Sequence, residues 1–194
     1  MNDKKPGWIK RTWRALRTPS TKFSLLTLLV IGFVGGVIFW GGYNTAMSAT
    51  NTLGFCTSCH EMQENYKEYK KSIHYNNPVG VRAICSDCHV PKEWFPMFIH
   101  KIKATHQLWG HLMGVINTPE KYEAARKELA EGVWKEMKAN NSRECRNCHS
   151  FKAMALDKQG HSAAKHHSPE YIAKTGKTCI DCHKGIAHNL PKDM

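Results

Sequence analysis

The longest apolar stretch of the chain covers residues 23–43 and reads FSLLTLLVIGFVGGVIFWGGY, without a charged residue. A helix of about 20 apolar residues can cross the roughly 30 Å hydrocarbon layer of a bilayer. Trp40 and Tyr43 lie where interfacial aromatic residues are common, and the preceding basic segment predicts a cytoplasmic N-terminus. We therefore expect a basic cytoplasmic tail at 1–22, a transmembrane anchor at 23–43 and a periplasmic domain at 44–194.

A cleaved signal peptide is the competing interpretation of this run. Ala46 and Ser48 form a weak small-x-small cleavage site. The apolar region of a signal peptide usually has only about 7–15 residues, so the longer run favours a retained anchor. Gly32 and Gly36 also form a GxxxG pattern, which could pack a second helix and leaves a homodimer open.

Two further segments have the apolar spacing of amphipathic helices. Residues 118–141 begin with Thr118 as N-cap and Pro119 at the first helical position, and residues 97–114 directly follow a proline. The stripes consist of Tyr122, Ala125, Leu129, Val133 and Met137 in the first segment, and of Phe98, Ile102, His106, Trp109 and Met113 in the second. No alternating apolar pattern suggests a strand. The expected fold class is mainly α, with a single N-terminal transmembrane helix and a compact domain of short helices and loops.

The eight cysteines all belong to four Cys-x-x-Cys-His motifs. The motif residues are Cys56, Cys59 and His60; Cys85, Cys88 and His89; Cys145, Cys148 and His149; and Cys179, Cys182 and His183. This pattern attaches c-type haem, since both cysteines form thioethers with the vinyl groups and the histidine ligates the iron. A thioredoxin-like pair needs no such histidine, and zinc ribbons do not place one after every second cysteine. We therefore expect four covalently bound c-type haems, which also replace much of the core.

The net charge of +12 has two sources. The tail before residue 23 carries seven lysines and arginines against one aspartate, as expected on the cytoplasmic side of an anchor. The remaining charge lies in the haem-bearing part, where two propionates on each haem offset it. The basic composition therefore does not call for a nucleic-acid partner.

Each haem iron has a second axial face, and eight histidines lie outside the motifs: His74, His100, His106, His111, His161, His166, His167 and His188. Iron with two histidine ligands is closed to substrate and suits electron transfer. We expect three of the four haems to take a distal histidine from this set. Met62, which follows the first motif only, is either a ligand of the first haem or a packing residue.

The order of a basic tail, an anchor and the segments CTSCHEM, SIHYNN, CSDCHVP, NNSRECRNCH and TCIDCHKGIAH resembles the NapC/NirT family of membrane-anchored tetrahaem cytochromes. The similarity is greatest to its NapC branch, with CymA and NrfH more distant. The resemblance implies quinol dehydrogenase activity: the protein would take electrons from membrane quinol and pass them to a periplasmic reductase in anaerobic respiration. Nitrate reductase is the first candidate acceptor. The implied location is the bacterial inner membrane, with lipid, quinol and a periplasmic reductase or cytochrome as partners.

The resemblance also implies roles for single residues. His74 matches a distal ligand of the fourth haem, His167 one of the second, and His188 that of the third. Met62 matches the methionine that ligates the first haem in the NrfH branch, and Lys101 matches a lysine beside that haem at the quinol site.

Two departures from the family pattern affect these expectations. Lys92 stands where members often have a histidine, and Gln107 stands where an acidic residue is common, so neither can play those roles. His106 is the expected substitute, which makes Lys101, His106 and Gln107 the candidate quinol site. His111 and His161 are expected not to ligate iron. The alternatives are a terminal reductase with an open haem, acting on nitrite or hydroxylamine, and an assembly module that holds metal through cysteine and histidine.

Overall fold

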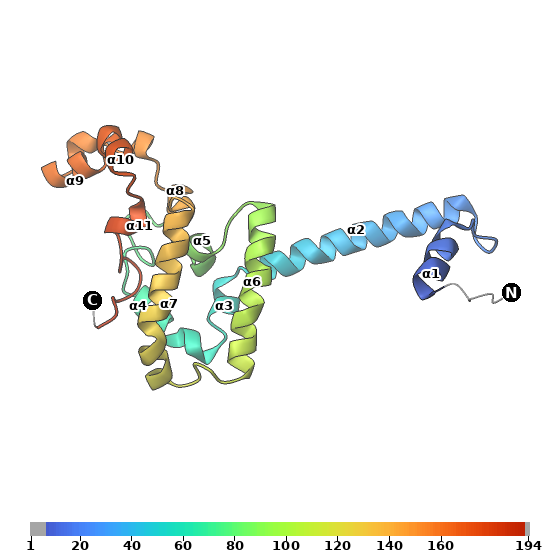
Figure 1. Ribbon diagram of the computed structural model, residues 1–194. Helices are drawn as coiled ribbons and strands as arrows, with labels where there is room; N and C mark the ends of the chain where they lie inside the picture. Colours follow the sequence, from blue (N-terminus) through green and yellow to red (C-terminus); the bar gives the residue numbers. More distant parts are fainter. Residues whose placement is uncertain (1–6, 193–194) are drawn as a thin grey trace. The chain divides into compact units, whose positions relative to one another are not determined.

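The computed structural model describes residues 7–192, and contacts divide the chain into two units, Met1–Ser48 and Ala49–Met194 (Figure 1). The first unit contains α1 (Trp8–Arg17) and α2 (Leu25–Ala49). Within the described residues, α2 is the one helix long and apolar enough to cross a membrane, with a mean hydropathy of 2.2 and no buried side chain. A helix that is apolar all round and unburied by protein suits a lipid environment.

The anchor helix extends six residues beyond the expected end of the span, to Ala49. Asn44 and Thr45 continue the helix, because their side chains donate hydrogen bonds to the carbonyls of Trp40 and Gly41, at 2.8 and 2.9 Å. Residues 44–49 thus form a short, uncharged helical segment between the apolar run and the rest of the chain.

The second unit is built from short helices and two long ones. Its α-helices are α3 (Leu53–Cys56), α4 (Gln63–Tyr69), α5 (Cys85–His89), α6 (Trp94–Leu112), α7 (Pro119–Ala139), α8 (Arg143–Arg146), α9 (His161–His166), α10 (Pro169–Thr175) and α11 (Cys179–Cys182). Three 3-10 turns, η1 (His60–Met62), η2 (Phe151–Ala153) and η3 (Leu156–Lys158), complete it. Residues 7–192 contain no strand, so the expected mainly α class is confirmed.

The two long helices, α6 and α7, stand apart in Figure 1, and His100 on α6 lies 3.6 Å from Glu136 on α7. The side chain of Thr118 accepts a hydrogen bond from the backbone N–H of Lys121 at 3.3 Å, which confirms the expected cap of α7. Helix α6 begins at Trp94, before Pro96 and not after it. A proline in the first turn removes an N–H that has no intrahelical partner, so the helix tolerates it.

The polypeptide supplies little core of its own. Among the described residues the buried apolar side chains are Tyr69, Tyr122 and Ile180, and the accessible surface is 15113 Å². A compact monomer of 22.1 kDa would expose only about 9,300 Å². Many large apolar side chains of both units are exposed, so much apolar surface is left uncovered by the polypeptide itself.

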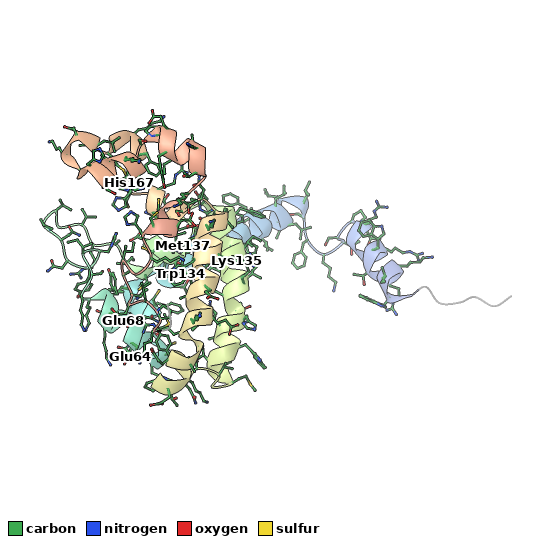
Figure 2. The ribbon with its side chains drawn as sticks, turned by 60° about the vertical axis from the view of Figure 1, so that its left-hand side comes forward. Glu64, Glu68, Trp134, Lys135, Met137 and His167 are labelled. Carbon is green, nitrogen blue, oxygen red and sulfur yellow. The ribbon has the colours of Figure 1, made fainter. Side chains whose placement is uncertain are left out.

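A buried ion pair joins α4, α7 and the C-terminal segment. Glu68, labelled in Figure 2, accepts hydrogen bonds from Arg126 Nη2 at 2.7 Å and from the backbone N–H of Asn189 at 3.0 Å. The side chain of Glu68 is only 12% exposed, and that of Arg126 only 11%. Burial raises the pKa of Glu68, but the bonds from Arg126 and Asn189 outweigh it, and the net pKa lies below the ordinary value. Nearby, Tyr122 donates its hydroxyl to Asn65 Oδ1 at 2.6 Å.

Candidate functional site

Short helices hold the four cysteine motifs. In α5 and α11 the residue before the second cysteine is an aspartate: Asp87 accepts from the N–H of Ile84 at 2.9 Å, and Asp181 from that of Thr178 at 2.8 Å. Each carboxylate caps its own helix start. The two cysteines of a motif are three residues apart, so one helical turn places both thiols on the same side.

The motifs follow one another in space in the order of the sequence. Helix α3, which carries Cys56, packs against α5, which carries Cys85. Helix α5 then packs against α8, which carries Cys145. The backbone N–H of Ile180 in α11 donates a hydrogen bond to Ser142, directly before α8, so the fourth motif lies beside the third. The neighbours are therefore first to second, second to third, and third to fourth motif.

A buried serine links the last two motifs by a hydrogen bond. Ser142, with no exposed surface, accepts a hydrogen bond from the backbone N–H of Ile180 at 3.2 Å. Its φ of 48° is in the left-handed region, directly before α8. This strained position lets the chain turn from the end of α7 into the third motif.

Three motif histidines each face a second histidine. The ring centroids are 6.2 Å apart for His89 and His188, 6.1 Å for His149 and His74, and 5.9 Å for His183 and His167. Two imidazoles on opposite faces of one metal ion, with metal–nitrogen bonds of about 2 Å, have ring centroids roughly 6 Å apart. The spacing of all three pairs therefore fits a single iron between the rings.

The structure pairs these histidines with other motifs than expected. His74 lies beside the third motif and not the fourth, His167 beside the fourth and not the second, and His188 beside the second and not the third. The C-terminal segment explains the position of His188: the adjacent Asn189 is bonded to Glu68 on α4, which keeps this segment away from the third motif.

The non-motif rings are oriented in different ways. Nδ1 of His167, labelled in Figure 2, lies 2.7 Å from Gln159 Oε1, so the amide oxygen accepts the Nδ1 proton and Nε2 is left for a metal. His166 instead bonds the Ser162 carbonyl of its own helix at 2.8 Å and stands edge-on to Tyr171. The structure therefore favours His167 over His166.

Burial keeps two other rings in the ligating form. The pKa values of His74 and His188 are lowered from the ordinary value, in both cases chiefly by burial. The Nδ1 atoms of these rings are buried without a hydrogen-bond partner among the described residues. A neutral imidazole is the form that binds metal, so both side chains suit ligation.

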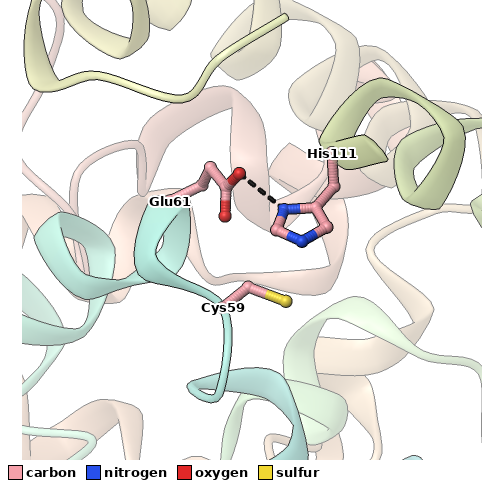
Figure 3. Close-up of side chains that lie close together, drawn as sticks. All are labelled: Cys59, Glu61 and His111. Carbon is pink, nitrogen blue, oxygen red and sulfur yellow. Dashed lines mark hydrogen bonds and ion pairs between the residues drawn. The ribbon is translucent and has the colours of Figure 1, made fainter. Parts of the chain in front are cut away.

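The first motif differs from the other three because a carboxylate contacts both of its paired histidine rings. His60 and His111 have ring centroids 5.9 Å apart, but Glu61 Oε1 lies 2.6 Å from His111 Nδ1 and 3.3 Å from His60 Nε2. The ligand atoms of Cys59, Glu61 and His111 all lie within 4.8 Å of one another (Figure 3). In the described part of the chain, no carboxylate forms an ion pair with the rings of the other three pairs.

This arrangement changes the expectation for two histidines of α6. His111, which was not expected near a haem, lies beside the first motif, whereas His106 is exposed and five residues away. Five residues correspond to roughly 140° around a helix, so the two rings point to different sides. Glu61 and Gln159 were not among the predicted site residues. The position of Glu61, immediately after a motif histidine, was a signal that could have identified it.

The remaining predicted residues do not form one cluster. Lys101 Nζ donates to the backbone oxygen of Thr50 at 3.0 Å and to its hydroxyl at 2.9 Å, and it is close enough to Cys56 to lower the pKa of that thiol. Gln107 is exposed on α6. Met62 is 41% exposed in η1.

These features fit covalently attached haem. The second and fourth cysteine pairs each lie within one short helix, three imidazole pairs have the spacing of axial ligands, and the chain buries little apolar core of its own. A structural zinc site would need four ligands converging on one point, whereas here paired rings face each other across a gap.

Comparison with known proteins agrees with this arrangement. The model of the NapC/NirT cytochrome c family, N-terminal region, matches residues 18–193. Cytochrome c-type protein NapC of Escherichia coli K12 is 56% identical over 98% of this chain and 94% of its own length. Denitrification system component NirT of Stutzerimonas stutzeri is 53% identical over 92% of this chain and 89% of its own.

A longer relative matches over part of its length. Cytochrome c-type protein TorC of Escherichia coli K12 is 45% identical over 94% of this chain, which covers 47% of TorC. No solved structure matches. With the four motifs, the apolar helix before them and a family match over nearly all its residues, the chain belongs to the NapC/NirT cytochrome c family.

Proposed function

We propose that this chain is a membrane-anchored tetrahaem cytochrome c that oxidises quinol at the outer face of the bacterial inner membrane and delivers the electrons to a periplasmic reductase. The spatial order of the motifs carries the proposal, because each motif neighbours the next, from Cys56, seven residues after α2, to Cys179. Electron transfer from a donor at the first motif to an acceptor at the last requires such a succession of neighbours. Residues 1–22 are then cytoplasmic, 23–43 cross the membrane and 44–194 are periplasmic. Nitrate reductase is the first candidate acceptor.

We assign axial ligands from the paired rings: His89 with His188 at the second motif, His149 with His74 at the third, and His183 with His167 at the fourth. Haem iron, when bound, takes up and passes on one electron at a time. Held between two such imidazoles, the iron would be closed to substrate. The pairs therefore support a carrier over a terminal reductase for nitrite or hydroxylamine.

The first motif is the proposed entry point for electrons. Glu61 engages the ring nitrogen of His60, so Met62 is our candidate for the ligand at this position. A thioether ligand raises the reduction potential relative to imidazole, which favours acceptance of electrons. Ordinary ligation by His60, with Met62 as a packing residue, is the alternative. Glu61 also orients the ring of His111 by the contact of 2.6 Å with its Nδ1.

Lys101 is the strongest of the three quinol-site candidates. Thr50 holds its ammonium group beside the first motif, where it can hydrogen-bond a quinol oxygen. Burial lowers the pKa of Lys101 from the ordinary value. His106 and Gln107 are exposed on other sides of α6 and would act only on quinol that approaches from there.

The test is the substitution Lys101→Ala in the full-length protein. A charge-assisted hydrogen bond contributes about 1.5–3 kcal/mol, so quinol-driven reduction should slow by roughly one to two orders of magnitude. Haem content and reduction by dithionite should stay at wild-type values. Lys103→Ala, an exposed lysine two residues along, is the matched control. An unchanged quinol-driven rate in Lys101→Ala would remove Lys101 from the quinol site.

A further inference from the structure

One side of α6 is apolar and uncovered. Phe95, Ile102, Trp109 and Met113 are 63%, 51%, 63% and 62% exposed. At about 100° per residue these four positions fall within an arc of roughly 40°. We call these four residues the α6 outer face.

The side of α6 opposite the outer face carries two histidines that contact the rest of this unit. His100 pairs with Glu136 on α7 at 3.6 Å, and His111 bonds Glu61 at 2.6 Å. Both histidines lie roughly 140–180° from the centre of the outer face. The first motif is thus on the inner side, so a haem there does not account for the apolar outer face.

The charge of α6 suits an anionic surface. From Trp94 to Leu112 the helix contains no aspartate or glutamate, while Lys101, Lys103 and three histidines are present. Exposed Lys103 lies about 90° from the centre of the outer face, where its ammonium group can reach outward while the stem covers apolar surface. Tryptophan and phenylalanine on one side and lysine at the edge are typical of helices that lie in a membrane interface.

Hydrogen bonds tie α6 to residues directly after the anchor. Lys101 Nζ is bonded to Thr50 at 2.9 and 3.0 Å, and Asn51 Nδ2 lies 3.2 Å from Met97 Sδ. Thr50 follows Ala49, the last residue of α2. The helical segment from Tyr43 to Thr50 rises about 10 Å at 1.5 Å per residue. Chain connectivity alone therefore keeps the middle of α6 within reach of the headgroup layer of the bilayer that α2 crosses.

We propose that the α6 outer face rests on the outer leaflet of that bilayer, with its apolar side chains among the upper acyl chains. The occupant is lipid, because α6 is hydrogen-bonded to Thr50, directly after the anchor, and is a basic helix. Such contact would fix the height of the first motif above the membrane. The inference depends on α2 as a membrane anchor and not on the identity of the electron donor or acceptor.

The test uses full-length holoprotein in nanodiscs of phosphatidylethanolamine and phosphatidylglycerol that contain a lipid with a diazirine high in its acyl chain. After illumination, lipid adducts are mapped by peptide mass spectrometry. We expect adducts in residues 94–113 as well as in α2, and none in α7. Adducts in α2 alone would overturn the proposal. Cross-links from 94–113 to a second copy, without lipid adducts, would also overturn it in favour of a protein interface.

A double variant makes the test specific for the outer face. Ile102→Asp with Trp109→Asp should lower the adducts in 94–113 at least fivefold, while the adducts in α2 and the Soret spectrum stay unchanged. Leu129→Asp, at an exposed leucine of α7, is the matched control and should leave the pattern as in the wild type. Adducts in 94–113 that persist in the double variant would contradict the assignment to this face.

Discussion

The ion pair between Arg126 and Glu68 should be the most sensitive polar contact in the second unit. In Arg126→Ala, Glu68 would remain 12% exposed or nearly so, without its guanidinium partner. Removal of one member of a buried pair costs about 3–5 kcal/mol. We expect about 3 kcal/mol, the low end, because Asn189 still donates two hydrogen bonds to the carboxylate, each of 3.0 Å. This corresponds to a factor on the order of 10² in the unfolding equilibrium.

The assay is urea unfolding of the holoprotein in detergent, followed by circular dichroism. With a slope of roughly 2 kcal/mol per molar urea, the midpoint should fall by about 1.5 M. The control is Lys67→Ala: Lys67 and Glu64 form a pair at 2.5 Å, but they are 60% and 42% exposed. An exposed pair contributes at most about 1 kcal/mol. Equal midpoints for the two variants would refute the reasoning.

The pH dependence provides a second check on this pair. The pKa of Glu68 is lowered in the folded protein from its ordinary value of 4.5. Its contribution to stability is therefore complete above pH 4.5 and is lost as the pH falls through the lowered value. The difference between wild type and Arg126→Ala should shrink in that acid range. A difference that stays constant from pH 7 into that range would contradict the role of an ionised Glu68.

Three further predictions concern the anchor and the haems. N-terminal sequencing of purified protein should start near Met1; a start near Ala49 would show that α2 is cleaved. Each of the variants His74→Ala, His167→Ala and His188→Ala should convert about one haem of four to high spin, because the iron loses its sixth strong-field ligand. The controls His161→Ala and His166→Ala should leave the spectrum unchanged. An unchanged spectrum in His167→Ala would contradict our ligand assignment at the fourth motif. Met62→Leu should alter the spectrum of one haem only, and wild-type spectra and quinol-driven rates in this variant would identify Met62 as a packing residue.

Features that depend on neighbouring residues could be predicted from the sequence. The mainly α class, the apolar helix and the cap of α7 at Thr118 are local, and the structure has them. The start of α6 was misplaced by three residues, because Pro96 was taken as a boundary although a first turn accommodates proline.

The pairing of histidines could not be predicted in the same way. His188 and its partner His89 are almost one hundred residues apart, and the position of His188 depends on the bonds between Asn189 and Glu68. A motif identifies a candidate ligand but contains no information on which distant ring it meets. The contact of Glu61 with His111 was missed for the same reason, because it depends on the position of α6 relative to the first motif.

The pairing has a consequence for the order in which the domain matures. If the chain is exported from its N-terminus, His74 is already outside when His149 emerges, and His167 is outside when His183 follows. The partner of His89 comes last of all, as His188, close to the end of the chain. The second motif would thus receive its haem early but complete its coordination only after translocation of nearly the whole protein. Loss of the last few residues should therefore leave a defect in the second centre, far from the damage in sequence.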